Sequence, residues 1–329
     1  MREPPAALSD AAQALFADDA PHGVSLALVV QHEGEVVFER YGVQPDTIFG
    51  PGGPVDATTP LVSWSTAKSI THALVGIAVG DGLLDVDAPA PVPEWRGTEK
   101  EAITLQNLLE MRPGLLFVED YVDDAVSHCL EMLYGSGKDD MAGYAASLPL
   151  LHAPGTVWNY SSGTTNIVSR IVGDAVTPPG GDRRAATEAF LRGRLFDPLG
   201  MTSVDPRFDP AGTFIGSSYV YATPRDFVTF GQLYLGDGMW KSRRILPEGW
   251  VDHARSFVAA DPDGEFAYGH HWWLWPDAHR AFGAHGYEGQ YIVVVPDRDL
   301  VVVHLGKSPA DRRAPLIAQL RGIIDAFEP

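Results

Sequence analysis

Two groups of β-branched and other apolar residues lie at opposite ends of the chain, and they constrain its fold more than any other feature. Near the start, residues 24–30 and 36–41 are typical of two strands separated by a short polar turn. Near the end, residues 290–295 and 300–304 are typical of two further strands that flank another turn. We therefore expect one sheet that combines strands from both ends of the chain.

The segment between these strands is helical in character. Residues 86–210 combine apolar residues at helical spacing with Pro/Gly turns, and they contain no clear period-two strand. Small and apolar residues also predict a helix at residues 65–80. The sequence thus predicts an α/β (α+β) fold. Residues 1–85 and 211–329 would form a sheet lobe flanked by helices, residues 86–210 an all-helical lobe, and the site would lie in the cleft between them.

The charge and composition narrow the choice of partners. The chain has 43 acidic and 24 basic residues, and this net charge of −19 would repel nucleic acid phosphates and an anionic membrane surface. It has neither an apolar leader nor the ~18 consecutive apolar residues of a membrane helix, which predicts a soluble, cytoplasmic protein. The single cysteine, Cys129, excludes an intramolecular disulfide. The oligomeric state is left open.

The most specific chemical feature is Ser65-Thr66-Ala67-Lys68, at the start of the predicted helix. A serine hydroxyl is a poor nucleophile near neutral pH and needs a base within hydrogen-bonding reach. Residues three apart are neighbours on a helix surface, so Lys68 would lie beside Ser65 and take its proton when the amine is neutral. Burial would lower the lysine pKa in favour of that form. Because this spacing is common, the assignment depends on two further segments.

The first of these segments contains Asn159-Tyr160-Ser161-Ser162, in a turn-rich stretch just before a predicted helix. An ammonium such as that of Lys68 would favour the Tyr160 phenolate, which could then relay protons to and from a leaving group. Ser162 could complete the hydrogen-bond network. The alternative is a structural tyrosine that closes a loop.

The second segment is Ala284-His285-Gly286-Tyr287, which leads into the strand at residues 290–295. Glycine lets the backbone approach a substrate closely, and an edge strand beside Ser65 could direct an amide at a developing oxyanion. Together with the Ser65 amide it would form a hole with two donors. The alternative is a glycine-rich approach to a hairpin that has no catalytic role.

The sequence lacks the patterns of a metal site and of an α/β-hydrolase active site. The chain has eleven histidines, including the adjacent pair His270-His271, but none shows the spacing of a metal site. The Gly-x-Ser-x-Gly turn of α/β-hydrolases is absent. We expect neither a metal nor a cofactor. His285, predicted to lie beside the nucleophile, either faces the substrate or has a structural role.

In this order the segments resemble the serine β-lactamase and penicillin-binding-protein superfamily, in particular its class C-like branch of esterases and 6-aminohexanoate-dimer hydrolases. The resemblance extends from about residue 24 to the C-terminus. It also includes Gly82-Leu83-Leu84-Asp85, Ile103-Thr104-Leu105-Gln106-Asn107, Phe196-Asp197-Pro198-Leu199-Gly200-Met201 and Ala222-Thr223-Pro224-Arg225-Asp226.

The resemblance implies the β-lactamase/transpeptidase-like fold, with an antiparallel sheet, helices and an all-helical lobe. It also implies a serine hydrolase that cleaves a small amide or ester without a cofactor. Ser65 would be the nucleophile that forms an acyl-enzyme, and Lys68 and Tyr160 would transfer protons. The backbone amides of Ser65 and Tyr287 would form the oxyanion hole.

Two positions depart from the pattern of the β-lactamases in this branch. Ser162 stands where they usually carry asparagine, and Ala284-His285-Gly286 stands where they carry Lys-Thr-Gly. Without that lysine the usual cationic anchor for a substrate carboxylate is missing, so β-lactams and D-Ala-D-Ala peptides become less favoured substrates. Tyr121 lies in a segment that resembles a cleft-lining loop of the nylon-oligomer hydrolases. It either contacts the leaving group or packs under the helical lobe.

Three alternatives to the hydrolase remain at this point. An acyltransferase would use the same acyl-enzyme with an alcohol or amine in place of water. A β-lactamase or D-amino peptidase is less favoured because the lysine is missing. A non-catalytic, ligand-binding homologue conflicts with the presence of Ser65, Lys68 and Tyr160 together.

Overall fold

The computed structural model describes residues 6–47, 50–121, 126–262, 264–276 and 278–327. Its central feature is an eight-stranded sheet in which every strand pairing is antiparallel. In spatial order the strands are β10 (Ala259–Ala260), β11 (Ala267–Tyr268), β12 (Trp273–Leu274), β13 (Phe282–Gly286), β14 (Gln290–Val295), β15 (Leu300–Lys307), β1 (Val24–His32) and β2 (Glu35–Tyr41).

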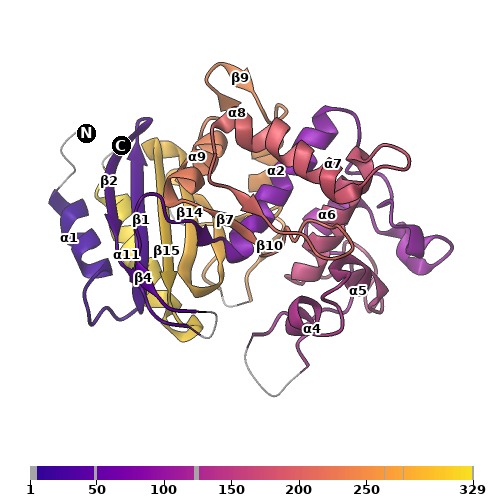
Figure 1. Ribbon diagram of the computed structural model, residues 1–329, viewed down its shortest axis with the longest axis horizontal. Helices are drawn as coiled ribbons and strands as arrows, with labels where there is room; N and C mark the ends of the chain where they lie inside the picture. The colour runs from indigo at the N-terminus through magenta and orange to yellow at the C-terminus, as the bar shows by residue number, and fades with distance from the viewer. Residues whose placement is uncertain (1–5, 48–49, 122–125, 263, 277, 328–329) are drawn as a thin grey trace.

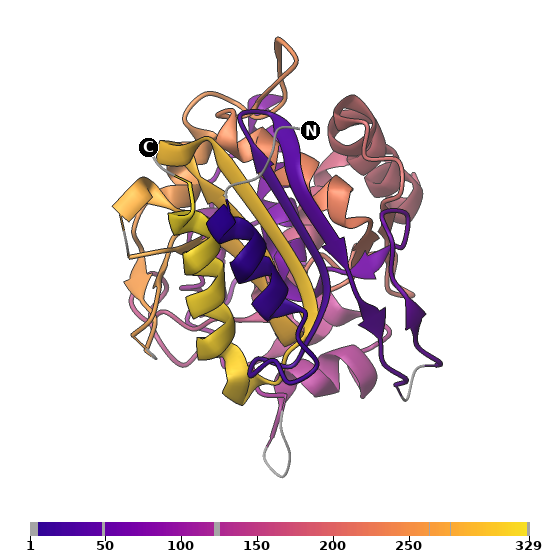
Figure 2. The ribbon, with the colours of Figure 1, turned by 90° about the vertical axis from the view of Figure 1, so that its left-hand side faces the viewer.

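The sheet combines both ends of the chain, as predicted. β1 lies between β2 and β15, with Val24 opposite Lys307 and His32 opposite Leu300. In Figure 2 the indigo β1 and the yellow β15 run side by side. The predictions of an antiparallel sheet and of strand pairs near both ends are therefore confirmed.

Both faces of this sheet are covered, which explains the unbroken apolar runs in the sequence. α1 (Ala6–Leu15) and α11 (Arg313–Asp325) pack on one face, in a core that includes Val302. α2 (Ala67–Gly80) and α9 (Pro224–Leu235) pack on the other, in a core that includes Val301 and Val303. Because neighbouring strand residues point to opposite faces, each of the three valines is buried.

The predicted middle segment combines helices with irregular stretches and lies beside the sheet, on the side away from α1 and α11 (Figure 1). Its helices are α3 (Leu105–Leu109), α4 (His128–Tyr134), α5 (Met141–Ser147), α6 (Ser162–Val176), α7 (Arg183–Phe190) and α8 (Asp197–Leu199). One short strand, β6 (Asp205–Pro206), also falls there and joins β5 (Leu61–Val62) and β7 (Val220–Ala222) in a small sheet. The remaining strands are β3 (Val43–Gln44), β4 (Gly53–Pro54), β8 (Met239–Trp240) and β9 (Arg243–Arg244), and the remaining α-helix is α10 (Trp250–Arg255).

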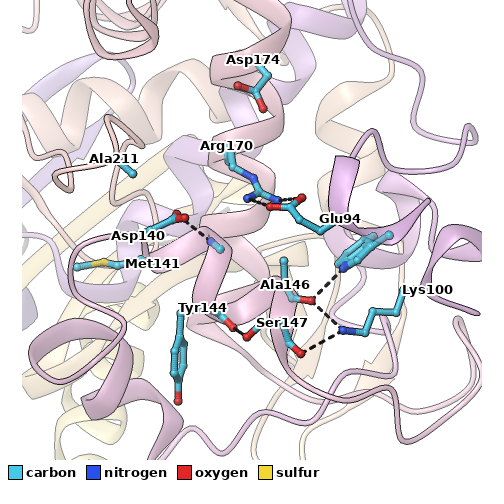
Figure 3. A network of polar contacts seen from close by, with 12 residues as sticks. Glu94, Lys100, Asp140, Met141, Tyr144, Ala146, Ser147, Arg170, Asp174 and Ala211 are labelled. Carbon is cyan, nitrogen blue, oxygen red and sulfur yellow. Dashed lines mark hydrogen bonds and ion pairs between the residues drawn. The ribbon is translucent and has the colours of Figure 1, made fainter. Parts of the chain in front are cut away.

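Polar side chains fasten an irregular segment to the helices α5 and α6 (Figure 3). The buried guanidinium of Arg170 donates two hydrogen bonds to Glu94, at 2.7 and 3.1 Å. Lys100 Nζ donates to the carbonyl of Ala146 at 2.9 Å, where α5 ends. The Lys100 contact satisfies a carbonyl group that a helix end leaves without a helical partner.

Helix α2 links the sheet to the helical part of the molecule. It contacts α6 on one side and β13 on another, and its residues 67–78 are buried. Within the described ranges, no helix is long and apolar enough to cross a membrane.

Candidate active site

Ser65 lies in a tight 3₁₀ turn, Trp64–Thr66, directly before α2. The preceding residue, Ser63, fixes the turn to β7: its amide donates to Val220 O at 2.8 Å, and its hydroxyl contacts the Val220 amide at 3.1 Å. Trp64 has a φ of +43°. A non-glycine residue in this left-handed region costs about 1–3 kcal/mol, so the surrounding contacts must hold the turn in place.

Lys68 is fully buried and faces three oxygen atoms. Its Nζ lies 2.9 Å from Ser65 Oγ, 2.9 Å from Ser162 Oγ and 3.0 Å from the carbonyl oxygen of Ser217. Burial lowers the Lys68 pKa, and the nearby negative charge of Glu119 works in the opposite direction. The structure thus brings together Ser65, Lys68 and Ser162, which the sequence had placed in one site.

Glu119 is a central member of this site that sequence reasoning missed. Its carboxylate accepts hydrogen bonds from the Ser162 amide at 2.7 Å, from Ser162 Oγ at 2.5 Å and from the Tyr121 hydroxyl. The only signal in the sequence was an acidic residue two positions before Tyr121, in the segment that resembles a cleft-lining loop. Nothing in its spacing pointed to Ser162.

These contacts set the direction of the hydrogen bonds around Lys68. Ser162 gives its hydroxyl proton to Glu119, so toward Lys68 it offers only a lone pair. The carbonyl of Ser217 can only accept. A neutral Lys68 amine would therefore donate to these two oxygens and direct its lone pair at the one remaining hydroxyl, that of Ser65.

Tyr160 is buried against the same site. Lys68 Nζ lies 4.8 Å from the centroid of its ring, which also packs against Trp273 and Tyr268. Burial and the charge of Glu119 raise the Tyr160 pKa far above its ordinary value, and a hydrogen bond with Ser65 opposes this only in part. The expected phenolate is therefore wrong for the resting site. The protonated phenol can donate a proton, and the base role of Lys68 stays a prediction.

The expectation of an edge strand beside Ser65 needs correction, because β13 lies between β12 and β14. Within β13, β12 pairs with Phe282 and Gly283 and not with residues 284–286, which extend beyond it. A Cβ added to Gly286 would lie 3.2 Å from Ser65 N and 2.6 Å from Ser63 O. Only glycine fits so close to the turn, and the next residue is Tyr287. The oxyanion role of the Ser65 and Tyr287 amides stays a prediction.

His285 presents an unpaired donor near the site. Its ring stacks on Trp273, at 5.3 Å between centroids, and its Nε2 accepts from Trp275 Nε1 at 3.0 Å. Burial holds the His285 pKa well below its ordinary value, so the ring is neutral and Nδ1 carries the proton. That buried Nδ1 has no hydrogen-bond partner in the part of the chain that the structure describes.

Two cavities meet at Ser65 and share Tyr121, Tyr287 and Glu288. The first has a volume of about 720 Å³, and most of its lining is apolar or aromatic. That lining includes Leu26, Leu61, Val62, Leu130, Leu133, Tyr134, Tyr219 and Tyr221. The second has about 450 Å³ and is lined by Tyr160, Glu265, Trp273, His285 and Arg313 among others. Tyr121, whose position was left open, thus lines the cleft.

Arg313 adds a positive charge to the second cavity. It begins α11, and its guanidinium lies 5.1 Å from the ring centroid of Phe266 and 5.9 Å from that of Trp273. No described carboxylate forms an ion pair with it. Among the same residues, no group of three or more His, Cys, Asp or Glu side chains could hold a metal ion.

Comparisons with known proteins agree over most of the chain. The family model described as Beta-lactamase matches residues 12–322. The 6-aminohexanoate-dimer hydrolase of Paenarthrobacter ureafaciens is 26% identical over 264 residues, which cover 74% of this chain. These residues span 65% of that relative's length, slightly less than two thirds.

Solved structures share the fold at lower identity. A proposed 6-aminohexanoate-dimer hydrolase from Bacillus anthracis superposes with a TM-score of 0.76 and 22% identity, over 92% of this chain and 78% of the other. A family VIII carboxylesterase superposes with a TM-score of 0.72 and 17% identity, over 97% of each chain. The predicted β-lactamase/transpeptidase-like fold is therefore confirmed.

Proposed function

The chain belongs to the Beta-lactamase family, and we propose that it is a serine hydrolase that cleaves a small amide or ester through an acyl-enzyme on Ser65. One observation carries this proposal above the others: a buried lysine amine lies 2.9 Å from a serine hydroxyl beside two cavities. A nucleophile within hydrogen-bonding reach of a base whose pKa is lowered by burial is the arrangement that acyl transfer requires.

In the proposed reaction, Ser65 Oγ attacks the substrate carbonyl while its proton moves to Lys68 Nζ. The oxyanion that forms accepts hydrogen bonds from the amides of Ser65 and Tyr287. The tetrahedral intermediate collapses as the Tyr160 phenol donates its proton to the leaving group, and Lys68 then restores that proton. Water attacks the acyl-enzyme in the second half of the reaction and releases the acid.

The cavities suggest how a substrate would lie. Tyr160 lines the second cavity and not the first. Since Tyr160 is the proposed proton donor to the leaving group, that group would occupy the second cavity, near His285 and Arg313. The acyl group would then occupy the larger, mostly apolar cavity.

The guanidinium of Arg313 favours a leaving group that carries a carboxylate, although Glu265, Glu288 and Asp311 also line the second cavity. Arg313 supplies a cation at that end of the cleft, although the lysine of Lys-Thr-Gly is absent. A linear amide such as the 6-aminohexanoate dimer, after which one relative is named, ends in a carboxylate. We propose substrates of this class ahead of β-lactams.

A covalent probe tests the function directly. A fluorophosphonate should add once to the wild-type protein, and intact mass spectrometry with peptide mapping should place the adduct on Ser65. Ser65→Ala should lose the adduct and at least about 10³-fold in turnover of a p-nitrophenyl ester. Ser256→Ala, which changes an exposed serine elsewhere, should keep both.

Absence of a serine-dependent adduct together with absence of turnover would exclude the hydrolase and favour a ligand-binding protein. Product analysis with added alcohols and amines separates hydrolysis from acyl transfer. An acyltransferase would give mainly ester or amide products at low concentrations of these nucleophiles.

A further inference from the structure

Two strained residues stand next to the two proposed oxyanion donors. Trp64, with φ +43°, directly precedes the Ser65 amide. Glu288, with φ +60°, directly follows Tyr287. Both are non-glycine residues in the left-handed region, where most side chains are disfavoured. Contacts from outside the local backbone must therefore hold each residue in this conformation.

The side chains of these two residues form a hydrogen bond with each other. Trp64 Nε1 donates to Glu288 Oε2 at 3.1 Å, although the residues lie far apart in the sequence. Lys307 Nζ donates to the same oxygen at 2.6 Å. The backbone carbonyl of Glu288 also accepts from the Ser308 amide at 2.9 Å. The Glu288 carboxylate therefore connects the turn of Ser65 to the turn after β13.

The aromatic ring of Trp64 adds a second contact between the same turns. It packs edge-on against the Tyr287 ring, with 6.0 Å between centroids. Glu288 and Lys307 are largely shielded, with side-chain exposures of 25% and 20%. An ion pair in this position is screened less by solvent than the exposed pairs of the molecule.

From this geometry we infer that Trp64, Glu288 and Lys307 act as a clamp that fixes the spacing of the Ser65 and Tyr287 amides. Trp64 and Glu288 are positioning residues, since neither is required to touch the reacting atoms. This role rests on the function proposed above.

Lys307 has a distinct part in the clamp. Glu288 lines both cavities, so its carboxylate lies near the place where negative charge develops during acylation. An uncompensated carboxylate there would oppose the oxyanion, and the ammonium at 2.6 Å cancels much of its field. The clamp thus holds the donors without adding net charge to the site.

Two variants break the clamp from opposite ends. Trp64→Phe keeps a ring and removes the indole donor, and Lys307→Met leaves Glu288 uncompensated. Each should lower kcat by about 10- to 100-fold with KM within about twofold, because misplaced donors in the first variant and an uncompensated carboxylate in the second affect the transition state more than the bound substrate. The affinity for a boronic acid that forms a tetrahedral adduct with Ser65 should fall by the same factor.

The conservative change Glu288→Gln tests whether activity is restored when the charge is removed and the hydrogen-bond acceptor is kept. Its amide oxygen can still accept from Trp64, so kcat should stay within about threefold of wild type. In the Lys307→Met background it should restore most of the lost activity, because the uncompensated charge is gone. Glu39→Gln, which breaks the distant ion pair with Arg225, serves as the matched control and should change neither kcat nor boronate affinity.

The outcomes separate this inference from the proposed function. If wild-type Ser65 reacts with a fluorophosphonate but Trp64→Phe and Lys307→Met keep wild-type kcat and boronate affinity, the clamp is wrong and the hydrolase stands. If both variants lose ester turnover and also have a lower melting temperature, and if Glu288→Gln does not restore the activity, these residues have only a structural role. If wild-type Ser65 does not react at all, both proposals fall.

Discussion

Two buried polar networks start from α2 and differ in where they end. The first joins Ser65, Lys68 and Ser162, and Ser65 opens into both cavities. The second starts at His72, about one helical turn beyond Lys68, and extends to Glu110 without lining either cavity. The same helix therefore carries a network that can reach a substrate and one that cannot.

The second network is a chain of hydrogen-bonded histidines, glutamine and glutamate. His72 Nε2 lies 3.1 Å from His253 Nδ1, and His253 Nε2 lies 3.0 Å from the side-chain oxygen of Gln106. Gln106 in turn contacts His270 at 2.8 Å and Glu110 at 2.9 Å. Burial lowers the pKa of His72 well below its ordinary value and that of His253 to about 3.

The comparison teaches that a shifted pKa has different consequences in the two networks. A lowered Lys68 pKa supplies a base beside a cavity, which is a condition for chemistry. A lowered His72 pKa supplies a neutral hydrogen-bonding group that joins α2 to α10 and to the segment around α3. The first should govern activity and the second stability.

The largest expected effect is on the first network. Lys68→Met removes the base and should lower the rate of acylation by about 10³-fold or more, because the Ser65 proton loses its acceptor. The free energy of unfolding should not fall by a comparable amount, since a buried amine is replaced by an apolar side chain. Stopped-flow acylation and urea unfolding measure the two quantities.

Lys100→Met is the matched control for that variant. Its amine also donates to carbonyl oxygens, those of Ala146 and Ser147, but far from Ser65 in the sequence and outside both cavities. Its acylation rate should equal that of wild type. A similar loss of activity in both variants would break the distinction between the networks.

Acid should act on stability through buried histidines. The pKa of His271 is lowered to about 3 by burial, whereas the unfolded chain keeps the ordinary value near 6.5. Above pH 6.5 both states are neutral and the contribution to stability is complete. Below it only the unfolded state takes up the proton, so stability falls by up to about 1.4 kcal/mol per pH unit for each such group, until the folded pKa is reached.

Urea unfolding between pH 7.5 and pH 4.5 checks this sign. His72→Phe, which keeps a ring next to Trp250, should reduce the acid sensitivity and lower stability at pH 7.5 by about 1–3 kcal/mol, since Tyr234 and His253 lose a partner. Its kcat at pH 7.5 should be unchanged. Stability that rises on acidification would contradict the neutral state of these histidines.

Glu119→Gln should have an intermediate effect on activity. It disturbs the direction of the hydrogen bonds at Ser162 and should lower kcat/KM by about tenfold. Because the charge of Glu119 raises the Lys68 pKa, its removal should also move the acidic limb of the pH profile to lower pH. A limb that stays in place, or moves to higher pH, would show that Glu119 does not act on the base.

The smallest expected effect concerns Arg313, which lines a cavity but belongs to neither network. Arg313→Met should lower kcat/KM about five- to tenfold for amides whose leaving group carries a carboxylate, and leave neutral analogues unchanged. A matched pair of substrates, the acid and its methyl ester, isolates the charge. Equal losses on both would assign Arg313 to packing on Phe266 and Trp273.

Strands buried on both faces could be predicted from the sequence because their composition alone identifies them. Residues 291–295 and 300–303 are apolar or aromatic without interruption, and the structure places them in β14 and β15. The two-residue strands β10, β11 and β12 could not, because two residues carry no periodicity. Their place in the sheet depends on successive pairing, of β12 with β13, β11 with β12 and β10 with β11, rather than on their own residues.

In the candidate site, too, some residues could be predicted from the sequence and others could not. Ser65 and Lys68 were accessible because a helix fixes the relation between residues three apart. Glu119 was not, since its contact with Ser162 depends on the fold around it. The state of Tyr160 also differed from expectation, because burial and Glu119 outweigh the effect expected from the lysine.

The pairing of β1 with β15 has a consequence for synthesis of the chain. The ribosome makes residues 24–32 long before their partners at 300–307, so β1 must wait with one edge unpaired while the intervening segment emerges. The face that α11 covers stays exposed even longer, because α11 follows β15 in the chain. Such long-range closure is slow, and the nascent protein should depend on holding chaperones until the final strand is made.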